Sequence, residues 1–263
     1  MRTQRLEKIE NFVYHYQAVT LDQLCDAFKV SKNTIRRDID EIVKGKKIEK
    51  TYGGVRVAKE GITLPSFGDR TVQNLDLKKR IARTACDYVK DGDIIFIDSG
   101  TTTCHMIEGL QNKQVTVLTN NLEFLIQAVP YTGLQVFSLS GELDRSTLSF
   151  TGPHTLEVLK SYNISKAFMA ATGISTHAEV SNTVPAESVV KKLAIARSQE
   201  VYLLLDSSKF NQTSMVTYSS FSNFDALITD KQPTGDLLIS LQKNDVEIVL
   251  ADCIGTPASR IVP

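Results

Sequence analysis

Apolar residues recur at helical spacing in three successive stretches of the first 42 residues, 3–17, 21–28 and 32–42. Each stretch places its apolar side chains on one face, so the three helices can pack around a small shared core. The pattern therefore predicts a three-helix unit at the start of the chain. The apolar residues of these faces are Leu6, Ile9, Phe12, Val13, Tyr16, Leu21, Leu24, Cys25, Phe28, Ile35, Ile39 and Ile42.

Polar residues at the ends of these stretches indicate where the second and third helices begin. Thr20 is followed three residues later by Gln23, which is the spacing of a capping box. Ser31 precedes the third stretch, and its hydroxyl can accept a free N–H of the first helical turn. Lys29 and Val30 remain to form the connection. We therefore predict two short helices joined by a tight turn.

A hairpin is expected directly after the third helix. Two short runs typical of strands, 48–51 and 55–58, flank Tyr52-Gly53-Gly54, and paired glycines between such runs favour a β-hairpin. Gly45 before them is a natural helix stop. Three helices followed by a hairpin describe a winged helix-turn-helix, which places its last helix in the DNA major groove.

From residue 59 the pattern changes. Gly61, Pro65 and Gly68 interrupt it, which predicts a linker over 59–72, and a helix is expected over 72–90. Apolar runs then alternate with helical stretches, which predicts a Rossmann-like, mostly parallel α/β sheet with helices on both faces. The expected strands are 94–98, 115–119, 134–140, 166–171, 201–206, 226–229 and 247–251, and the helices between them are 102–110, 122–129, 153–162, 185–197 and 235–243.

Charge is distributed unevenly between these two parts. The chain has 263 residues and a formal net charge of zero, but residues 1–60 hold 13 Lys/Arg against 9 Asp/Glu, whereas the remainder holds 17 against 21. A basic first quarter on an otherwise mildly acidic protein indicates that this quarter meets an anionic polymer. The four cysteines have no zinc-ligand spacing, no nucleotide-binding glycine motif occurs, and no apolar run is long enough to span a bilayer. We therefore expect a cytoplasmic protein without metal or cofactor.

The third predicted helix carries the side chains that suit DNA. Arg can form two hydrogen bonds with one guanine, and Asn can form two with one adenine. These contacts favour Lys32, Asn33 and Arg36 for binding to base edges. Hydroxyls and further cations suit phosphate oxygens, which fix the position of a protein on DNA. The residues expected at phosphates or on the wing are Ser31, Thr34, Arg37, Lys46, Lys47, Lys50, Tyr52, Gly53, Gly54 and Arg56, and Asp38 is expected to orient one of the two arginines or support the helix start.

Small polar residues follow most of the predicted sheet strands. Ligands of parallel sheets bind where the strands end, and Ser-Gly-Thr-Thr running into a helix offers free N–H groups and hydroxyls that suit a phosphate. Lys191 or Lys209 can add a cation. Such residues also serve as ordinary turn and cap residues, but several loops of this kind on one sheet edge favour an anion site. These loops are 98–103, 119–121, 140–142 and 206–209.

Segments in both parts of the chain resemble the sequences of a known family. The segments VSKNTIRRDIDEI and TYGGV are similar to the signature of the DeoR family of bacterial transcriptional regulators. The likeness continues through IDSGTTT, LTNN, SGELDRSTLSFTG, Glu187 with Lys191, and LLDSSKF. One departure lies at the wing, where the family commonly has a basic residue and then a histidine and this chain has Lys50-Thr51-Tyr52.

The resemblance implies an effector domain that is similar in fold to ribose-5-phosphate isomerase and senses phosphorylated sugars or related metabolites. Two departures concern this domain. The family often has a double glycine where this chain has Gly141-Glu142, and 170–173 replaces the acidic catalytic cluster of the isomerase. The pocket candidates that the resemblance implies are Asp98, Ser99, Gly100, Thr101, Thr102, Asn120, Gly141, Gly152, Glu187, Lys191, Asp206 and Lys209.

Together these observations predict a transcriptional regulator with three parts: a winged helix-turn-helix over 1–58, a linker over 59–72, and an effector-binding and oligomerisation domain over 73–263. We expect a repressor of a carbohydrate-metabolism operon that binds operator DNA as a dimer or tetramer and is not an enzyme. The alternatives are a sugar-phosphate isomerase that carries a nucleic-acid-binding head, in which Glu187 acts with Lys191 or Lys209, and an activator or architectural DNA protein.

Overall fold

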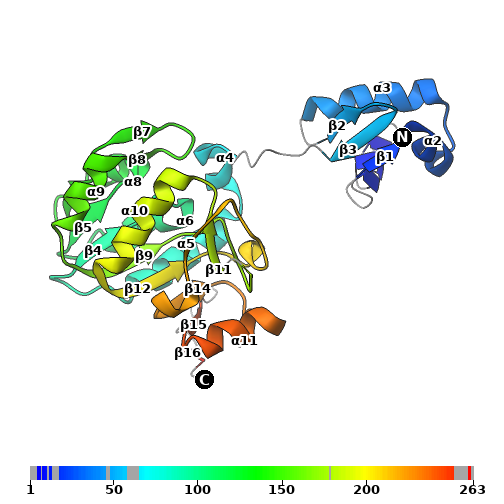
Figure 1. Ribbon diagram of the computed structural model, residues 1–263. Helices are drawn as coiled ribbons and strands as arrows, with labels where there is room; N and C mark the ends of the chain where they lie inside the picture. The colour runs from blue at the N-terminus through cyan, green and yellow to red at the C-terminus, as the bar shows by residue number, and fades with distance from the viewer. Residues whose placement is uncertain are drawn as a thin grey trace. The chain divides into compact units, whose positions relative to one another are not determined.

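The computed structural model describes residues 5–6, 8–10, 12–13, 18–45, 48–57, 65–177, 179–251 and 260–261 (Figure 1). The chain falls into two compact units, Met1–Thr63 and Leu64–Pro263, here called the N-terminal and C-terminal units. Among the described residues, no helix combines the length and the apolar character that crossing a membrane requires.

The N-terminal unit is a winged helix-turn-helix, as the sequence predicts. The described residues between 5 and 13 are helical, and Ile9 and Val13 are buried together with Leu24, Ile35 and Ile39 of the two helices that follow. A three-stranded antiparallel sheet in the order β1-β3-β2 forms the wing. The elements are β1 (Ala18–Thr20), α2 (Leu21–Phe28), α3 (Lys32–Ile42), the short 3-10 helix η1 (Val43–Gly45), β2 (Ile48–Thr51) and β3 (Gly54–Val57).

The predicted caps fix the ends of α2 and α3. The Gln23 N–H donates to Thr20 Oγ1 at 3.2 Å, and Gln23 Oε1 accepts the Thr20 N–H at 2.8 Å, so the capping box is complete. Ser31 Oγ accepts the Thr34 N–H at 3.4 Å at the start of α3. Lys29 ends α2 in the left-handed region at φ 52°, which turns the chain toward α3 within two residues.

The two wing glycines have different structural roles. Gly53 occupies the left-handed region at φ +88° and makes the hairpin turn. Gly54 lies against β1, where an added Cβ would stand 2.2 Å from the Val19 carbonyl oxygen. The sequence pattern predicted no strand between the first two helices; instead 18–20 form strand β1, because Gly54 lets the backbones of β1 and β3 approach closely enough to pair.

Replacing Gly54 by alanine is expected to destabilise the N-terminal unit by about 1–3 kcal/mol, because the new methyl group overlaps the Val19 carbonyl. Replacing Gly53 by asparagine is the matched control: no atom lies within 4 Å of the added Cβ, and asparagine tolerates positive φ. Thermal unfolding of the full chain measures both variants. Equal stability of G54A and the unmodified protein would contradict the close approach.

A mostly parallel sheet forms the centre of the C-terminal unit, as predicted. All seven expected strands are present, and β16 joins them antiparallel to β15. The sheet order is β16-β15-β14-β12-β9-β4-β5-β6. These strands are β4 (Ile94–Ile97), β5 (Thr116–Thr119), β6 (Gln135–Ser138), β9 (Ile164–Met169), β12 (Ser198–Leu204), β14 (Ala226–Thr229), β15 (Glu247–Leu250) and β16 (Arg260–Ile261).

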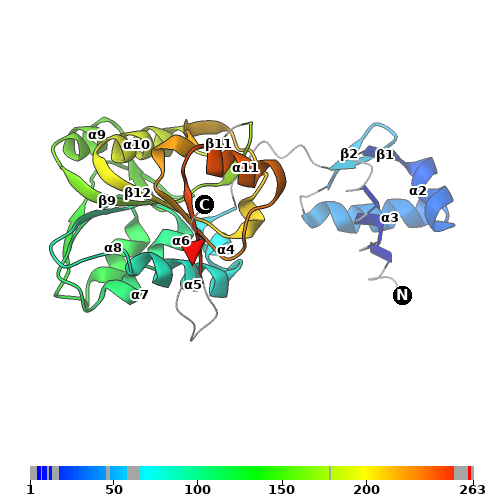
Figure 2. The same cartoon turned by 90° about the horizontal axis from the view of Figure 1, so that it is seen from below.

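Helices cover both faces of this sheet, and each face has its own core (Figure 2). Successive residues of β4 point to opposite faces of the sheet. Ile95 and Ile97 therefore pack into the first core, and Phe96 packs into the second. The first face carries α5 (Leu75–Cys86), α6 (Thr101–Cys104), α7 (Ile107–Leu110) and α8 (Leu122–Ala128), and the second carries α9 (Pro153–Lys160), α10 (Pro185–Ala196) and α11 (Gly235–Lys243).

Helix α4 (Phe67–Val72) lies in a segment that was predicted as linker. Ser66 caps it by accepting the Asp69 N–H at 3.2 Å, which offsets the helix-breaking effect of Gly68. The helix expected over 72–90 is instead α5, because Asn74 takes φ 53° and separates it from α4. The single helix expected over 102–110 is likewise divided into α6 and α7.

Two small antiparallel sheets, which the sequence pattern did not predict, complete the C-terminal unit. Their strands are three or four residues long and rich in polar residues, so they lack an apolar run. They are β7 (Glu142–Asp144) paired with β8 (Ser149–Thr151), and the sheet β10-β11-β13 formed by Gly173–Ser175, Glu179–Asn182 and Val216–Ser219.

Candidate functional site

Helix α3 presents a polar, basic side to solvent. Its apolar residues Ile35, Ile39 and Ile42 are buried in the core of the N-terminal unit. Their burial at helical spacing leaves the opposite side free, as predicted. Lys32, Asn33, Arg36 and Arg37 are exposed there, and Thr34 is half-buried beside the Ser31 cap.

The exposed cations of this unit differ in how they are paired. Lys32 Nζ lies 2.5 Å from Asp22, whose carboxylate raises the pKa of that lysine, and Lys50 Nζ lies 2.5 Å from Asp40. Arg36 and Arg37 form no hydrogen bond or ion pair with another residue that the structure describes. Binding of an anion to either arginine would therefore break no ion pair with a described residue.

A groove separates α3 from the wing. Its lining includes Arg36 and Asp40 of α3, Lys50 and Thr51 of β2, and both wing glycines. Tyr52 stands fully exposed at the tip of the turn. Lys46 and Lys47, also predicted for the wing, lie outside the described residues.

Asp38 serves the core of the N-terminal unit. It is buried, and its carboxylate accepts Arg5 Nε at 2.7 Å and Arg5 Nη2 at 3.3 Å. Asp38 orients an arginine, as predicted. That arginine is Arg5 of the first helix, however, and not one of the two arginines of α3. The sequence could not indicate this contact, because it joins residues 33 positions apart.

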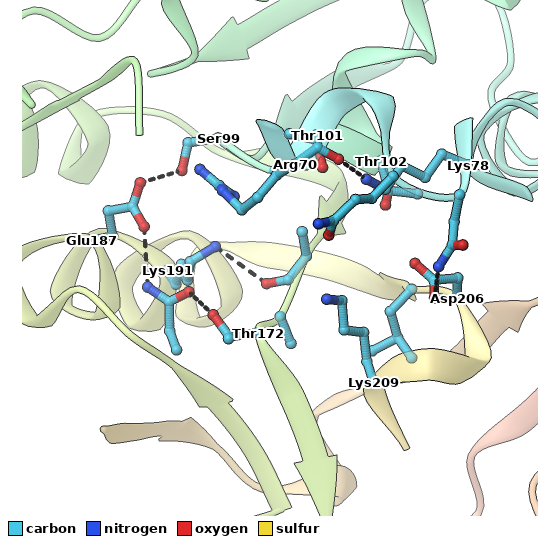
Figure 3. A pocket seen from close by; sticks show the side chains of 17 residues that line it. Arg70, Lys78, Ser99, Thr101, Thr102, Thr172, Glu187, Lys191, Asp206 and Lys209 are labelled. Carbon is cyan, nitrogen blue, oxygen red and sulfur yellow. Dashed lines mark hydrogen bonds between the residues drawn. The ribbon is translucent and has the colours of Figure 1, made fainter. Parts of the chain in front are cut away.

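A polar pocket opens at the carboxyl ends of β4, β9 and β12 in the C-terminal unit (Figure 3). The loops that follow these strands supply one part of its wall. Helices α4, α5, α6 and α10 and strand β11 supply the rest. The lining residues are Arg70, Gln73, Asn74, Lys78, Ser99, Gly100, Thr101, Thr102, Ala170, Ala171, Thr172, Asn182, Glu187, Lys191, Leu205, Asp206 and Lys209.

An ion pair between Asp98 and Lys191 forms the floor of this pocket. The two side chains are 1% and 3% exposed, and Lys191 Nζ donates to Asp98 Oδ2 and, at 3.1 Å, to the Ala170 carbonyl. Asp98 also accepts the N–H groups of Ser99 and Ala170, both at 2.8 Å. A buried charge is stable only with such partners, so this network holds the loops after β4 and β9 together.

Glu187 forms a second network on one side of the pocket. Its Oε1 accepts Ser99 Oγ at 2.9 Å and Ser149 Oγ at 2.8 Å, and its Oε2 accepts Asn182 Nδ2 at 3.1 Å. Thr172 Oγ1 donates to Asn182 Oδ1 at 3.3 Å. Carboxylate, amide and hydroxyl groups in such an arrangement can exchange hydrogen bonds with the hydroxyls of a polyol.

Cations gather on the other side of the pocket. Lys78 Nζ donates to the Arg70 carbonyl, and burial lowers the pKa of Lys78 to about 8. Burial also lowers the pKa of Arg70, against the pull of Glu187 and Asp144. Lys209 enters from the short 3-10 helix η2 (Ser207–Lys209), whose capping residue Asp206 accepts Asn74 Nδ2 at 3.0 Å. No described group of three His, Cys, Asp or Glu side chains is placed to hold a metal ion.

The structure brings most of the pocket candidates together but not all of them. Asp98 is buried in the floor, where it pairs with Lys191, and does not itself line the pocket. Asn120 is buried elsewhere and donates to the Phe150 carbonyl at 3.1 Å, while Gly141 packs against Thr151 and Gly152 precedes α9. Glu142, the unexpected acid beside Gly141, is exposed on β7 away from the pocket. The predicted residues that line the pocket are Ser99, Gly100, Thr101, Thr102, Glu187, Lys191, Asp206 and Lys209.

Sequence reasoning missed the contribution of α4 and α5. Arg70, Asn74 and Lys78 line the pocket with spacings of four residues, which is a signal for one helical face. That signal was hidden because a charged face normally points to solvent. Thr172 and Asn182 were also missed, since they belong to the loop after β9 and to the unpredicted strand β11.

Comparison with known proteins connects both units to one family. Residues 5–61 match the family described as the DeoR-like helix-turn-helix domain, and residues 73–231 match the DeoR C terminal sensor domain. The second match alone spans more than half of the chain. It contains the strands β4 to β14 and most of the residues that line the pocket.

Similar proteins align over nearly the whole chain. The HTH-type transcriptional regulator IolR of Bacillus subtilis (strain 168) is 38% identical over 90% of this chain and 94% of its own length. The glycerol-3-phosphate regulon repressor of Escherichia coli (strain K12) is 28% identical over 95% and 99%. The lactose phosphotransferase system repressor of Lactococcus lactis subsp. lactis is 29% identical over 88% of this chain and 92% of its own length.

Among solved structures, a ribose 5-phosphate isomerase A from Methanocaldococcus jannaschii is similar over part of the chain. The match covers 52% of this chain and 55% of that protein, with 21% identity and a TM-score of 0.40. This similarity is too small to bear on function.

Proposed function

Because the chain belongs to the DeoR family of transcriptional regulators, we propose that it represses a carbohydrate-metabolism operon and leaves its operator when a phosphorylated sugar or related metabolite binds. Two of the relatives are named as repressors, one of a glycerol-3-phosphate regulon and one of a lactose phosphotransferase system. A repressor of this kind acts in the cytoplasm, where the chromosomal operator and the phosphorylated metabolite are both present.

The charge of the pocket is the observation that carries the proposal. Four cationic side chains line it against two carboxylates, and Asp98 of the floor neutralises one of the four, so the remaining excess of positive charge favours an anion. Arg70, Lys78 and Lys209 are the cations that suit a phosphate, because Lys191 is already paired with Asp98. Glu187 and Asn182 suit the hydroxyls of the same ligand. A phosphate monoester of a polyol satisfies both sides.

This proposal treats the pocket as a sensor without catalysis. An isomerase needs a carboxylate base that is free to take a proton from the sugar. The only described carboxylates that line the pocket are Glu187, whose oxygens accept three donors, and Asp206, which caps η2 and accepts Asn74. Incubation with ribose 5-phosphate is therefore expected to give no ribulose 5-phosphate, and measurable turnover would overturn this part of the proposal.

The central experiment follows operator binding and ligand binding together. The operator is selected from genomic DNA by the full-length protein, and its release is measured by fluorescence anisotropy against a panel of phosphorylated sugars that includes glycerol 3-phosphate. The unphosphorylated sugars are the matched controls. We expect at least one phosphorylated member to release the DNA at a concentration that leaves its unphosphorylated partner inactive. Release by neither kind of ligand would refute the sensor.

The oligomer that binds DNA forms a further part of the proposal. A two-fold dimer or tetramer presents two copies of α3 to half-sites about 34 Å apart, one turn of the DNA helix. Light scattering of the free protein and its operator complex measures the number of chains. A single chain bound to each operator would contradict this arrangement.

Anion binding in the pocket is expected to weaken as the pH rises through about 8. Burial places the pKa of Lys78 near 8 in the free protein, and the groups that face it are Asp206, Lys209 and Arg70. An anion beside Lys78 favours the ammonium, so above this pH each binding event must take up a proton. Sulfate, whose charge is constant in this range, is expected to bind about tenfold less tightly at pH 9 than at pH 7.

Replacing Lys78 by arginine is the control for this titration, because a guanidinium stays charged throughout the range. The variant is expected to bind sulfate with an affinity that changes little between the two pH values. Isothermal titration calorimetry in two buffers of different ionisation enthalpy measures how many protons the protein takes up when sulfate binds. An equally steep fall of affinity in K78R would exclude Lys78 as the group responsible.

A further inference from the structure

Arg70 connects the pocket to the beginning of the C-terminal unit. Its Nε donates to the Pro65 carbonyl at 3.1 Å, and Pro65 is the second residue of that unit. The rest of its guanidinium lies in the pocket, where Figure 3 shows it extending toward Ser99 and Glu187. One side chain therefore touches both the ligand site and the point from which the chain leads to the N-terminal unit.

One nitrogen of the Arg70 guanidinium, Nη2, lacks an acceptor within the described part of the chain. Nη2 is buried and has no hydrogen-bond partner there, which is costly for a charged group. The two acids that act on it electrostatically are Glu187 and Asp144. Glu187 accepts three other donors, and Asp144 accepts the Ser146 N–H at 2.8 Å. An oxygen of an anionic ligand would supply the missing acceptor.

The two ends of α4 are each held by a cation of the pocket. At its start, Arg70 binds the Pro65 carbonyl next to the Ser66 cap. At its end, Lys78 Nζ binds the carbonyl of Arg70 itself. A ligand that draws Arg70 and Lys78 toward itself must change or fix both contacts, so it acts on the whole of this short helix.

We propose that Arg70 transmits ligand binding to the DNA-binding unit: an anion such as a phosphate monoester engages Arg70 Nη2 and, through the Nε contact with the Pro65 carbonyl, fixes the start of α4. This inference rests on the proposed function, because it takes the pocket to be the site of the effector. Arg70 is a positioning residue as well as a ligand contact. Its removal uncouples the ligand from the DNA even where the ligand still binds.

Lys209 provides the matched comparison. It lines the same pocket and carries the same charge, but it comes from η2 and forms no hydrogen bond or ion pair with α4 among the described residues. A cation that only attracts the ligand should change the concentration at which the ligand acts. A cation that also transmits the signal should change the size of the response at saturation.

The experiment measures amide hydrogen exchange of the full-length protein with and without inorganic phosphate or glycerol 3-phosphate as probes. In the unmodified protein, the saturating probe is expected to slow exchange in peptides covering 65–72 by about fivefold or more. K209Q is expected to need more probe but to reach the same protection. R70K keeps a cation but cannot bridge both partners, and it is expected to bind the probe without protecting 65–72.

R70Q serves as a second variant, and thermal unfolding of each free protein verifies that it is folded. Full protection of 65–72 in R70K or R70Q at saturating probe would overturn the proposal, as would binding to the unmodified protein that leaves 65–72 unchanged. Operator release separates this inference from the proposed function. If saturating glycerol 3-phosphate or another effector releases R70K from DNA as completely as the unmodified protein, the inference fails and the sensor stands. If no phosphorylated sugar releases the unmodified protein while phosphate still protects 65–72 through Arg70, the sensor function fails and the contact stands.

Discussion

Replacing Arg36 and Arg37 together by alanine is expected to weaken operator binding by about 30-fold to several thousand-fold, because a good base contact contributes about 1–3 kcal/mol and a phosphate contact adds to it. Both arginines are exposed on the side of α3 opposite its buried isoleucines, and within the described residues neither is engaged by an acid. Binding of these arginines to DNA would break no ion pair with a described residue, whereas binding of Lys32 would break its ion pair with Asp22.

Salt dependence and sequence dependence separate the two arginines. Loss of a phosphate contact should reduce the slope of log affinity against log salt by about one and weaken all sequences alike. Loss of a base contact should relax specificity at one position of the operator. Single alanine variants measured by anisotropy at several salt concentrations make this distinction.

Lys243→Ala is the control for the double variant, since it removes an exposed cation from the end of α11 in the C-terminal unit. Its operator affinity is expected to match that of the unmodified protein. An R36A/R37A protein with unchanged affinity and unchanged salt slope would show that α3 does not read DNA.

Local signals made the N-terminal unit predictable. The capping box of Thr20 and Gln23, the Ser31 cap and the buried isoleucines of α3 all act within a few residues of each other, and all are found as expected. Strand β1 was missed, since its pairing with β3 depends on the approach of Gly54 to Val19, which no local pattern encodes.

The sheet of the C-terminal unit was predictable for a related reason. Strands buried on both faces read as continuous apolar runs, as β4 and β14 do, and their alternation with helices fixes a parallel arrangement. The pocket depends on longer-range contacts. Arg70 and Lys78 read as a solvated helical face, and only the packing of α4 against α6 and of α5 against α6, β12 and β14 turns these cations inward. Asn120 and Gly141 show the opposite error, because small polar residues at turns satisfy the backbone as often as they bind ligands.

The ion pair in the floor of the pocket gives the prediction with the largest expected effect on stability. Asp98 and Lys191 are almost fully buried, so replacing Lys191 by methionine leaves a carboxylate that has lost its cation in a site closed to water. The expected loss is about 3–5 kcal/mol, which lowers the melting temperature of a unit of this size by about 6–20 °C. Asp98 retains the N–H groups of Ser99 and Ala170, which places the expected loss toward the lower end of this range.

An exposed pair on the same unit provides the matched control. Lys79 lies 2.9 Å from Glu108, but the two side chains are 44% and 55% exposed, so solvent screens their attraction. Replacing Lys79 by methionine is expected to cost less than about 1 kcal/mol. In the variant that carries both Asp98→Asn and Lys191→Met, the unpaired charge is gone, and most of the lost stability should return. Calorimetry of the full chain measures all three. An unpaired, buried carboxylate must destabilise K191M more than the loss of an exposed ion pair destabilises K79M. Equal stability of the two variants would therefore show that the buried ion pair does not organise the floor of the pocket.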